Sequence, residues 1–147
     1  MRKMLTGGVA VTLAVAAAAA TGAFAGGNGA QRSGLSPQSG SMAMQCKPGS
    51  GAGTNGFVML NAPGQPGNAN KLIGEVSLKN ATPNTTYMVA VSVGDQNCMP
   101  EGSLTTNGQG NGNAHIADSS LTNGSFYVVL TDMSSKEVFA SAPVTVN

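Results

Sequence analysis

Residues 74–93 constrain the fold more than any other part of this 147-residue sequence. Small or apolar residues alternate with polar ones over 74–79, and a valine-rich alternation with one tyrosine runs over 86–93. A period of two, rich in β-branched and aromatic residues, is typical of a strand with one buried face. The intervening Asn, Pro and Thr residues favour a turn. The sequence therefore predicts a central pair of strands joined by a turn.

From residue 57 onward, short apolar runs alternate with turn-forming residues about every ten positions. Further strands are predicted at 57–60, 102–106, 113–117, 125–131, 137–140 and 144–146. The Asn-Gly sequences between residues 106 and 113 predict a hairpin, because Asn and Gly both tolerate positive φ. Nothing after residue 25 sustains a helical period. The pattern predicts one antiparallel all-β domain over 57–147, a sandwich or barrel of about seven to eight strands.

The alternation also predicts which side chains are buried, because one face of each strand must cover the core. These side chains are Leu72, Val76, Leu78, Tyr87, Val89, Val91, Leu104, Ile116, Phe126, Val128 and Leu130.

Residues 81–91 read A-T-P-N-T-T-Y-M-V-A-V. This run resembles the L-x-P-x-T-x-Y-x-V-x-V pattern of fibronectin type III domains and related immunoglobulin-like modules, in which a Pro-containing turn leads into a strand whose Tyr packs at the corner of the sandwich. The runs G-S-L-T-T-N-G-Q-G-N-G-N-A-H-I (102–116) and A-S-A-P-V-T-V (140–146) are similar to small secreted bacterial proteins of this type, most of them uncharacterised. The resemblance implies an immunoglobulin-like, fibronectin type III-like β-sandwich and specifies the fold far better than a function.

Residues 1–25 have the features of a secretory signal peptide. A positive start at Arg2 and Lys3 precedes an apolar run over 9–20, and Ala23-Phe24-Ala25 supplies the small-x-small cleavage pattern. Cleavage is predicted between Ala25 and Gly26. The alternative is an uncleaved anchor, but the apolar run is shorter than the roughly 20 residues that span a bilayer. We expect a secreted protein, extracellular or in the bacterial cell envelope, with no stable membrane insertion after cleavage.

Residues 26–56 are rich in Gly, Ser, Gln and Asn and contain almost no large apolar residues. Such a composition buries too little surface to offset the entropy of ordering, so a flexible linker is predicted here. Of the 7 basic residues, two fall in the signal, which leaves five against 6 acidic residues. A near-neutral mature chain without a basic stripe argues against nucleic acid and anionic membranes as partners.

Cys46 and Cys98 are the only cysteines of the chain. An even count in an exported protein favours a disulfide over free thiols, and no C-x-x-C or metal-binding spacing competes with this interpretation. We predict the Cys46–Cys98 disulfide.

Two groups of residues have compositions that metal sites also use. Methionines at 42, 44, 59, 88, 99 and 133 could supply thioether ligands to copper, but a blue-copper centre needs two His and His115 is the only one. The Gly-Asn-rich residues 108–113 faintly resemble a Ca²⁺-binding repeat, but a single copy without a carboxylate is better explained as a loop. No metal or cofactor is expected.

A small hydrolase would have to use His115 and Asp118, with Ser119 or Ser120 as nucleophile. Neither serine lies in the strained G-x-S-x-G turn that exposes a nucleophile. The leading prediction is therefore a monomeric, non-enzymatic module, structural or binding, with an unknown protein or glycan partner. A hydrolase or, less favoured, a copper-binding envelope protein remains the alternative.

Overall fold

The computed structural model describes residues 29–38, 46–63, 72–94, 97–132, 134 and 137–146. These residues contain nine β-strands and no helix: β1 (Gln31–Pro37), β2 (Gly56–Asn61), β3 (Leu72–Leu78), β4 (Thr86–Val93), β5 (Cys98–Thr105), β6 (Gly112–Asp118), β7 (Gly124–Asp132), β8 (Val138–Ser141) and β9 (Val144–Val146). Over the same residues, no helix has the length and apolar character to cross a membrane. The predicted signal peptide and its cleavage site at Ala25 and Gly26 lie outside the described residues.

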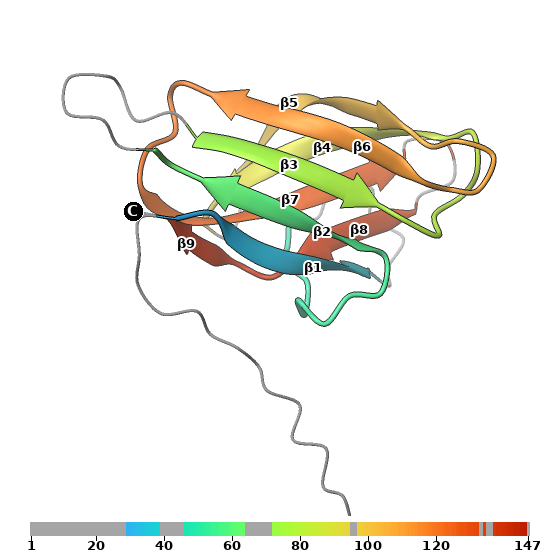
Figure 1. The fold of residues 1–147 in the computed structure, drawn as a ribbon, viewed down its shortest axis with the longest axis horizontal. Helices are drawn as coiled ribbons and strands as arrows, with labels where there is room; N and C mark the ends of the chain where they lie inside the picture. The colour runs from blue at the N-terminus through green and yellow to red at the C-terminus, as the bar shows by residue number, and fades with distance from the viewer. Residues whose placement is uncertain are drawn as a thin grey trace, which may run out of the picture.

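All strand pairs are antiparallel, and the strand order is β5-β4-β7-β8-β1-β2-β3-β6, with β9 added to β7. Strand β1 joins the two halves of the sheet, because its first residues pair with β2 and its last residues pair with β8. The sheet curls until its two ends, β5 and β6, come into contact, so it nearly closes into a barrel (Figure 1). The predicted antiparallel all-β class is confirmed.

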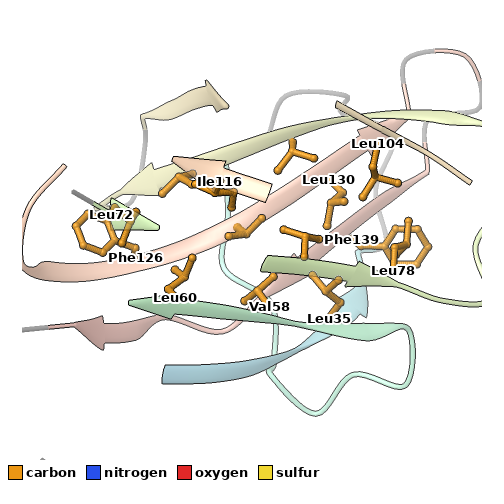
Figure 2. Close-up of a cluster of buried hydrophobic side chains, with 14 of the residues drawn as sticks. Leu35, Val58, Leu60, Leu72, Leu78, Leu104, Ile116, Phe126, Leu130 and Phe139 are labelled. Atoms are coloured by element: carbon orange, nitrogen blue, oxygen red, sulfur yellow. The ribbon is translucent and has the colours of Figure 1, made fainter. Parts of the chain in front are cut away.

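The core lies inside this curl, and every residue predicted to be buried is buried. The side chains in Figure 2 come from both halves of the sheet and meet in one cluster. The structure adds residues that the sequence prediction left out, chiefly Leu35, Val58, Leu60 and Phe139. Full burial of each such side chain stabilises the fold by roughly 1.5–3 kcal/mol, so the cluster dominates the stability.

Strand β1 lies inside residues 26–56, where the sequence predicted a flexible linker, and that prediction is wrong for this strand. Its sequence, Q-R-S-G-L-S-P, offers only one large apolar side chain, which is too weak a pattern to recognise. Leu35 is nonetheless fully buried, and both neighbouring strands hydrogen-bond to β1. Gly49 is also held in place, since its backbone N–H donates to Ser141 O at 2.8 Å. Tertiary pairing, not local pattern, orders this part of the chain.

The predicted hairpin around residues 107–112 is also wrong. β5 pairs with β4 and β6 pairs with β3, so the loop crosses from one end of the sheet to the other. The Asn107 side chain closes the loop by accepting hydrogen bonds from the backbone N–H of Gln109 (2.9 Å) and Asn111 (3.0 Å). Gly110 has φ +74°, and a Cβ there would lie 2.0 Å from Ala81 O. Likewise, the predicted central strands β3 and β4 lie in opposite halves and do not pair.

A smaller group of buried side chains lies apart from the main core. This satellite cluster contains Tyr127, Val129, Val138 and Ala140, with Cys46 and Cys98 packed against it. The predicted Cys46–Cys98 disulfide is present, with 5.6 Å between the two Cα atoms. Tyr127 also donates its hydroxyl hydrogen bond to Cys46 O at 2.8 Å. Disulfide and tyrosine together fasten the segment that begins at Cys46 to β5 and β7.

Tyr87, at the start of β4, is fully buried and packs against Phe139. Its hydroxyl donates a short hydrogen bond to Glu137 Oε2, and Thr82 N lies 3.2 Å from both of these oxygens. Burial, followed by the hydrogen bond to Glu137 and its charge, raises the pKa of Tyr87 to about 12. The tyrosine therefore stays neutral and links the turn before β4 to the start of β8.

Replacing Tyr87 with phenylalanine should lower the free energy of unfolding by about 1.5 kcal/mol. The hydroxyl bonds a carboxylate, and such bonds contribute about 1.5–3 kcal/mol; partial exposure of Glu137 favours the low end. Urea unfolding would measure the change. Tyr127→Phe is the matched control, since its hydroxyl bonds an uncharged carbonyl and should cost about 1 kcal/mol. A Tyr87→Phe protein as stable as the parent would contradict the assignment.

Candidate functional site

The outer face of the β1–β2–β3–β6 half carries a row of side chains that the strand register aligns. Arg32 lies opposite Met59, Met59 opposite Glu75, and Glu75 opposite His115. All four are exposed, because their neighbours along each strand turn inward. We call these four residues the outer row.

Two contacts organise the outer row. His115 Nδ1 lies 2.7 Å from Glu75 Oε1, with both side chains about 60% exposed (60% and 63%), so water screens the pair and it contributes little stability. At the other end, the Arg32 guanidinium carbon lies 4.1 Å from the centre of the Phe57 ring, a cation–π contact.

A shallow, mainly apolar hollow of about 180 Å³ lies beside the outer row. Its lining comes from Ala30, Met59, Asn61, Ile73, Gly74, Glu75 and His115. Met59, at 38%, is one of two large apolar side chains exposed among the described residues. The hollow therefore brings the exposed Met59 thioether next to the His115–Glu75 pair on one face.

A second group lies where the two ends of the sheet meet. Glu101 lies on β5 and Asp118 on β6, and each carboxyl group shifts the pKa of the other. Burial, then the hydrogen bond to Asp118 and its charge, raises the pKa of Glu101 to about 7. Hydrogen bonding from the Ser120 hydroxyl is the main cause that lowers the pKa of Asp118. Two carboxyls with separated pKa values can share one proton near neutral pH.

The residues predicted for a hydrolase do not form one unit. His115 pairs with Glu75, whereas Asp118, three residues further along β6, accepts a hydrogen bond from Ser120 Oγ at 2.6 Å. The Ser120 hydroxyl therefore donates to a carboxylate whose pKa is lowered, which is too weak a base to activate a serine nucleophile.

The cysteines and methionines are likewise dispersed. Cys46 and Cys98 are joined in the disulfide, which leaves neither thiolate available to copper. Met59 lies on the outer face, whereas Met99 packs partly buried against the core. The methionines at 42, 44 and 133 lie outside the described residues. Within the part of the chain that is described, no three His, Cys, Asp or Glu residues gather in a way that could hold a metal ion.

Sequence reasoning missed both acidic partners, Glu75 and Glu101. Glu75 is 40 residues from His115 in sequence, and only the β3–β6 register brings them together. Glu101 reaches Asp118 because the curled sheet brings its two ends together. The only local signal was Pro100-Glu101-Gly102, a Pro and a Gly around a lone charge, which is typical of an irregular edge strand.

No protein-family model, curated protein or solved structure matches this chain.

Proposed function

We propose that this protein is a secreted, non-enzymatic module that binds a partner protein through the outer row and its hollow. The observation that carries this proposal is the alignment of Arg32, Met59, Glu75 and His115 on one exposed face. Methionine, arginine and aromatic side chains are enriched in protein interfaces, and this face presents all three types. A glycan is the competing partner, and the experiment below distinguishes the two.

Its class and location are part of the same proposal. The antiparallel strands and the buried tyrosine at the start of β4 support an immunoglobulin-like, fibronectin type III-like origin for the curled sheet. The disulfide favours an oxidising compartment and so supports export, together with the signal-like first 25 residues. The proposal also includes a monomeric state, because all residues of the outer row belong to a single chain.

Substituting Met59 with lysine should weaken partner capture at least about tenfold, a loss of 1.4 kcal/mol that is modest for a central interface residue. The tagged mature protein would be incubated with cell-envelope and medium fractions, and the captured proteins quantified by mass spectrometry. Thr105→Lys is the matched control, because Thr105 is also exposed on a strand, in the other half of the sheet.

Equal capture by the parent and Met59→Lys would contradict the proposed face, provided that both variants keep the parent's melting temperature. Capture that is lost when the fractions are deglycosylated would assign a glycan partner instead.

The hydrolase alternative makes the opposite prediction. The parent would turn over one substrate in a panel of esters, peptides and glycosides, and His115→Ala would abolish that activity. We expect no turnover by either protein. Among the described residues, His115 contacts the exposed Glu75 carboxylate and not the hydroxyl or thiol that a nucleophile would provide.

A further inference from the structure

Met59 lies between two charged side chains of the outer row. The register places Arg32 of β1 directly opposite Met59 on one side and Glu75 of β3 directly opposite it on the other, and the three strands lie side by side in Figure 1. Residues that face each other across neighbouring strands have Cβ atoms about 4.5–5.5 Å apart, which brings their side chains within reach. A change of polarity at Met59 therefore acts on a cation and on a carboxylate at once.

Met59 is also the most exposed methionine among the described residues. It is 38% exposed and lines the shallow hollow. Met88 is half-buried on β4, and Met99 is half-buried against the main core. A small oxidant attacks thioethers according to their accessibility, so Met59 is the first of these three methionines that it reaches.

We propose that Met59 is an oxidation site and that its conversion to methionine sulfoxide by hydrogen peroxide inactivates the outer row. The second part of this proposal rests on the proposed binding function. In the reaction, a lone pair of the thioether sulfur attacks one peroxide oxygen, so that a sulfur–oxygen bond forms and the oxygen–oxygen bond breaks. A proton passes from the attacked oxygen to the leaving oxygen, which departs as water. Sulfur is oxidised by two electrons and the peroxide is reduced.

The sulfoxide changes the outer row through Arg32. Among the described interactions, the Arg32 guanidinium contacts the Phe57 ring and no carboxylate, and its N–H donors remain available. The new sulfoxide oxygen is a hydrogen-bond acceptor beside it, so the guanidinium moves from the ring to Met59. The Glu75 carboxylate only accepts hydrogen bonds and already pairs with His115. Oxidation therefore replaces an apolar centre with a polar one and repositions the cation next to it.

Peroxide titration of the mature protein with peptide mapping tests the oxidation site. Sulfoxide should form at Met59 before it forms at Met88 or Met99. The Phe57 ring shields the Arg32 side-chain protons in the NMR spectrum, because the guanidinium lies over its face. These signals should move downfield as Met59 is oxidised. Met59→Leu, a swap that conserves volume and removes the sulfur, should leave the Arg32 signals unresponsive to peroxide.

The effect on binding is measured by the capture of cell-envelope and medium proteins. Capture by the oxidised parent should fall about tenfold, the loss expected for Met59→Lys. Capture by Met59→Leu, whatever its starting level, should not respond to peroxide, which separates Met59 from every other oxidised group. The melting temperature of each treated protein shows that the fold is retained.

Oxidation of Met88 or Met99 before Met59, or Arg32 signals that stay unchanged when Met59 is oxidised, would overturn the proposal without affecting the proposed function. Undiminished capture by the oxidised parent, when Met59→Lys has lost capture, would do the same. Equal capture by Met59→Lys and the untreated parent would instead overturn the proposed function and with it the effect of oxidation on binding. The order of oxidation would still decide whether Met59 is the modification site.

Discussion

Replacing Leu35 with alanine should lower the free energy of unfolding by about 2–5 kcal/mol, the usual cost of truncating a fully buried leucine. Leu35 has no exposed surface and belongs to the main core. It also lies where β1 passes from β2 to β8, since Leu35 pairs with Ser141 while Gly34 still pairs with Phe57. The cavity would therefore open at the junction between the two halves of the sheet. Urea unfolding followed by circular dichroism would measure the loss.

Arg32→Ala in the same strand is the matched control. Its side chain is exposed and contacts only the Phe57 ring among the interactions described, so it should cost no more than about 1 kcal/mol. If residues 26–56 were a flexible linker throughout, both substitutions would leave stability unchanged. That outcome would show that β1 is not part of the folded domain.

Removing the disulfide with Cys46→Ser and Cys98→Ser together should cost about 4 kcal/mol in the chain-entropy model, because the bond closes a loop of 52 residues. The same change releases the segment that covers the satellite cluster, where Tyr127 bonds Cys46 O. The melting temperature of the double variant should therefore fall well below that of the oxidised parent.

Reduced parent protein provides the control, since it keeps both cysteines and should unfold with the same midpoint as the double variant. Peptide mapping without reductant should recover a peptide containing Cys46 linked to one containing Cys98. Free thiols at both positions in freshly secreted protein, or a double variant as stable as the oxidised parent, would contradict the assignment.

The strands with a clear alternation were predictable from the sequence almost residue by residue. β4 was predicted at its observed bounds, and the residues of β7 that enter the main core, Phe126, Val128 and Leu130, were predicted correctly. The burial of Tyr127 and Val129 on the other face of β7 was not predicted. β1 was missed because one leucine among polar and small residues carries no period. Its order comes from hydrogen bonds to strands that lie far away in the sequence.

The candidate sites were predictable only in part. The two cysteines were correctly paired. The partners of His115 and Asp118 were not found, because Glu75 and Glu101 stand alone in the sequence. A lone carboxylate gives no local sign of the strand that will face it.

By itself, the sequence determined the all-β class, the inward faces of most strands and the disulfide. Alternation is a local pattern that can be read over a few residues, and two cysteines in a chain allow only one intramolecular disulfide. The tertiary structure decided which strands are neighbours. It placed β3 and β4 in different halves of the sheet and put β5 and β6 at its two ends, in contact but without a hydrogen-bonded ladder, although turn chemistry alone favoured pairing in both cases. Strand order depends on how several buried faces close around one core, and that is a property of the whole chain. The outer row and the Glu101–Asp118 pair follow from that closure.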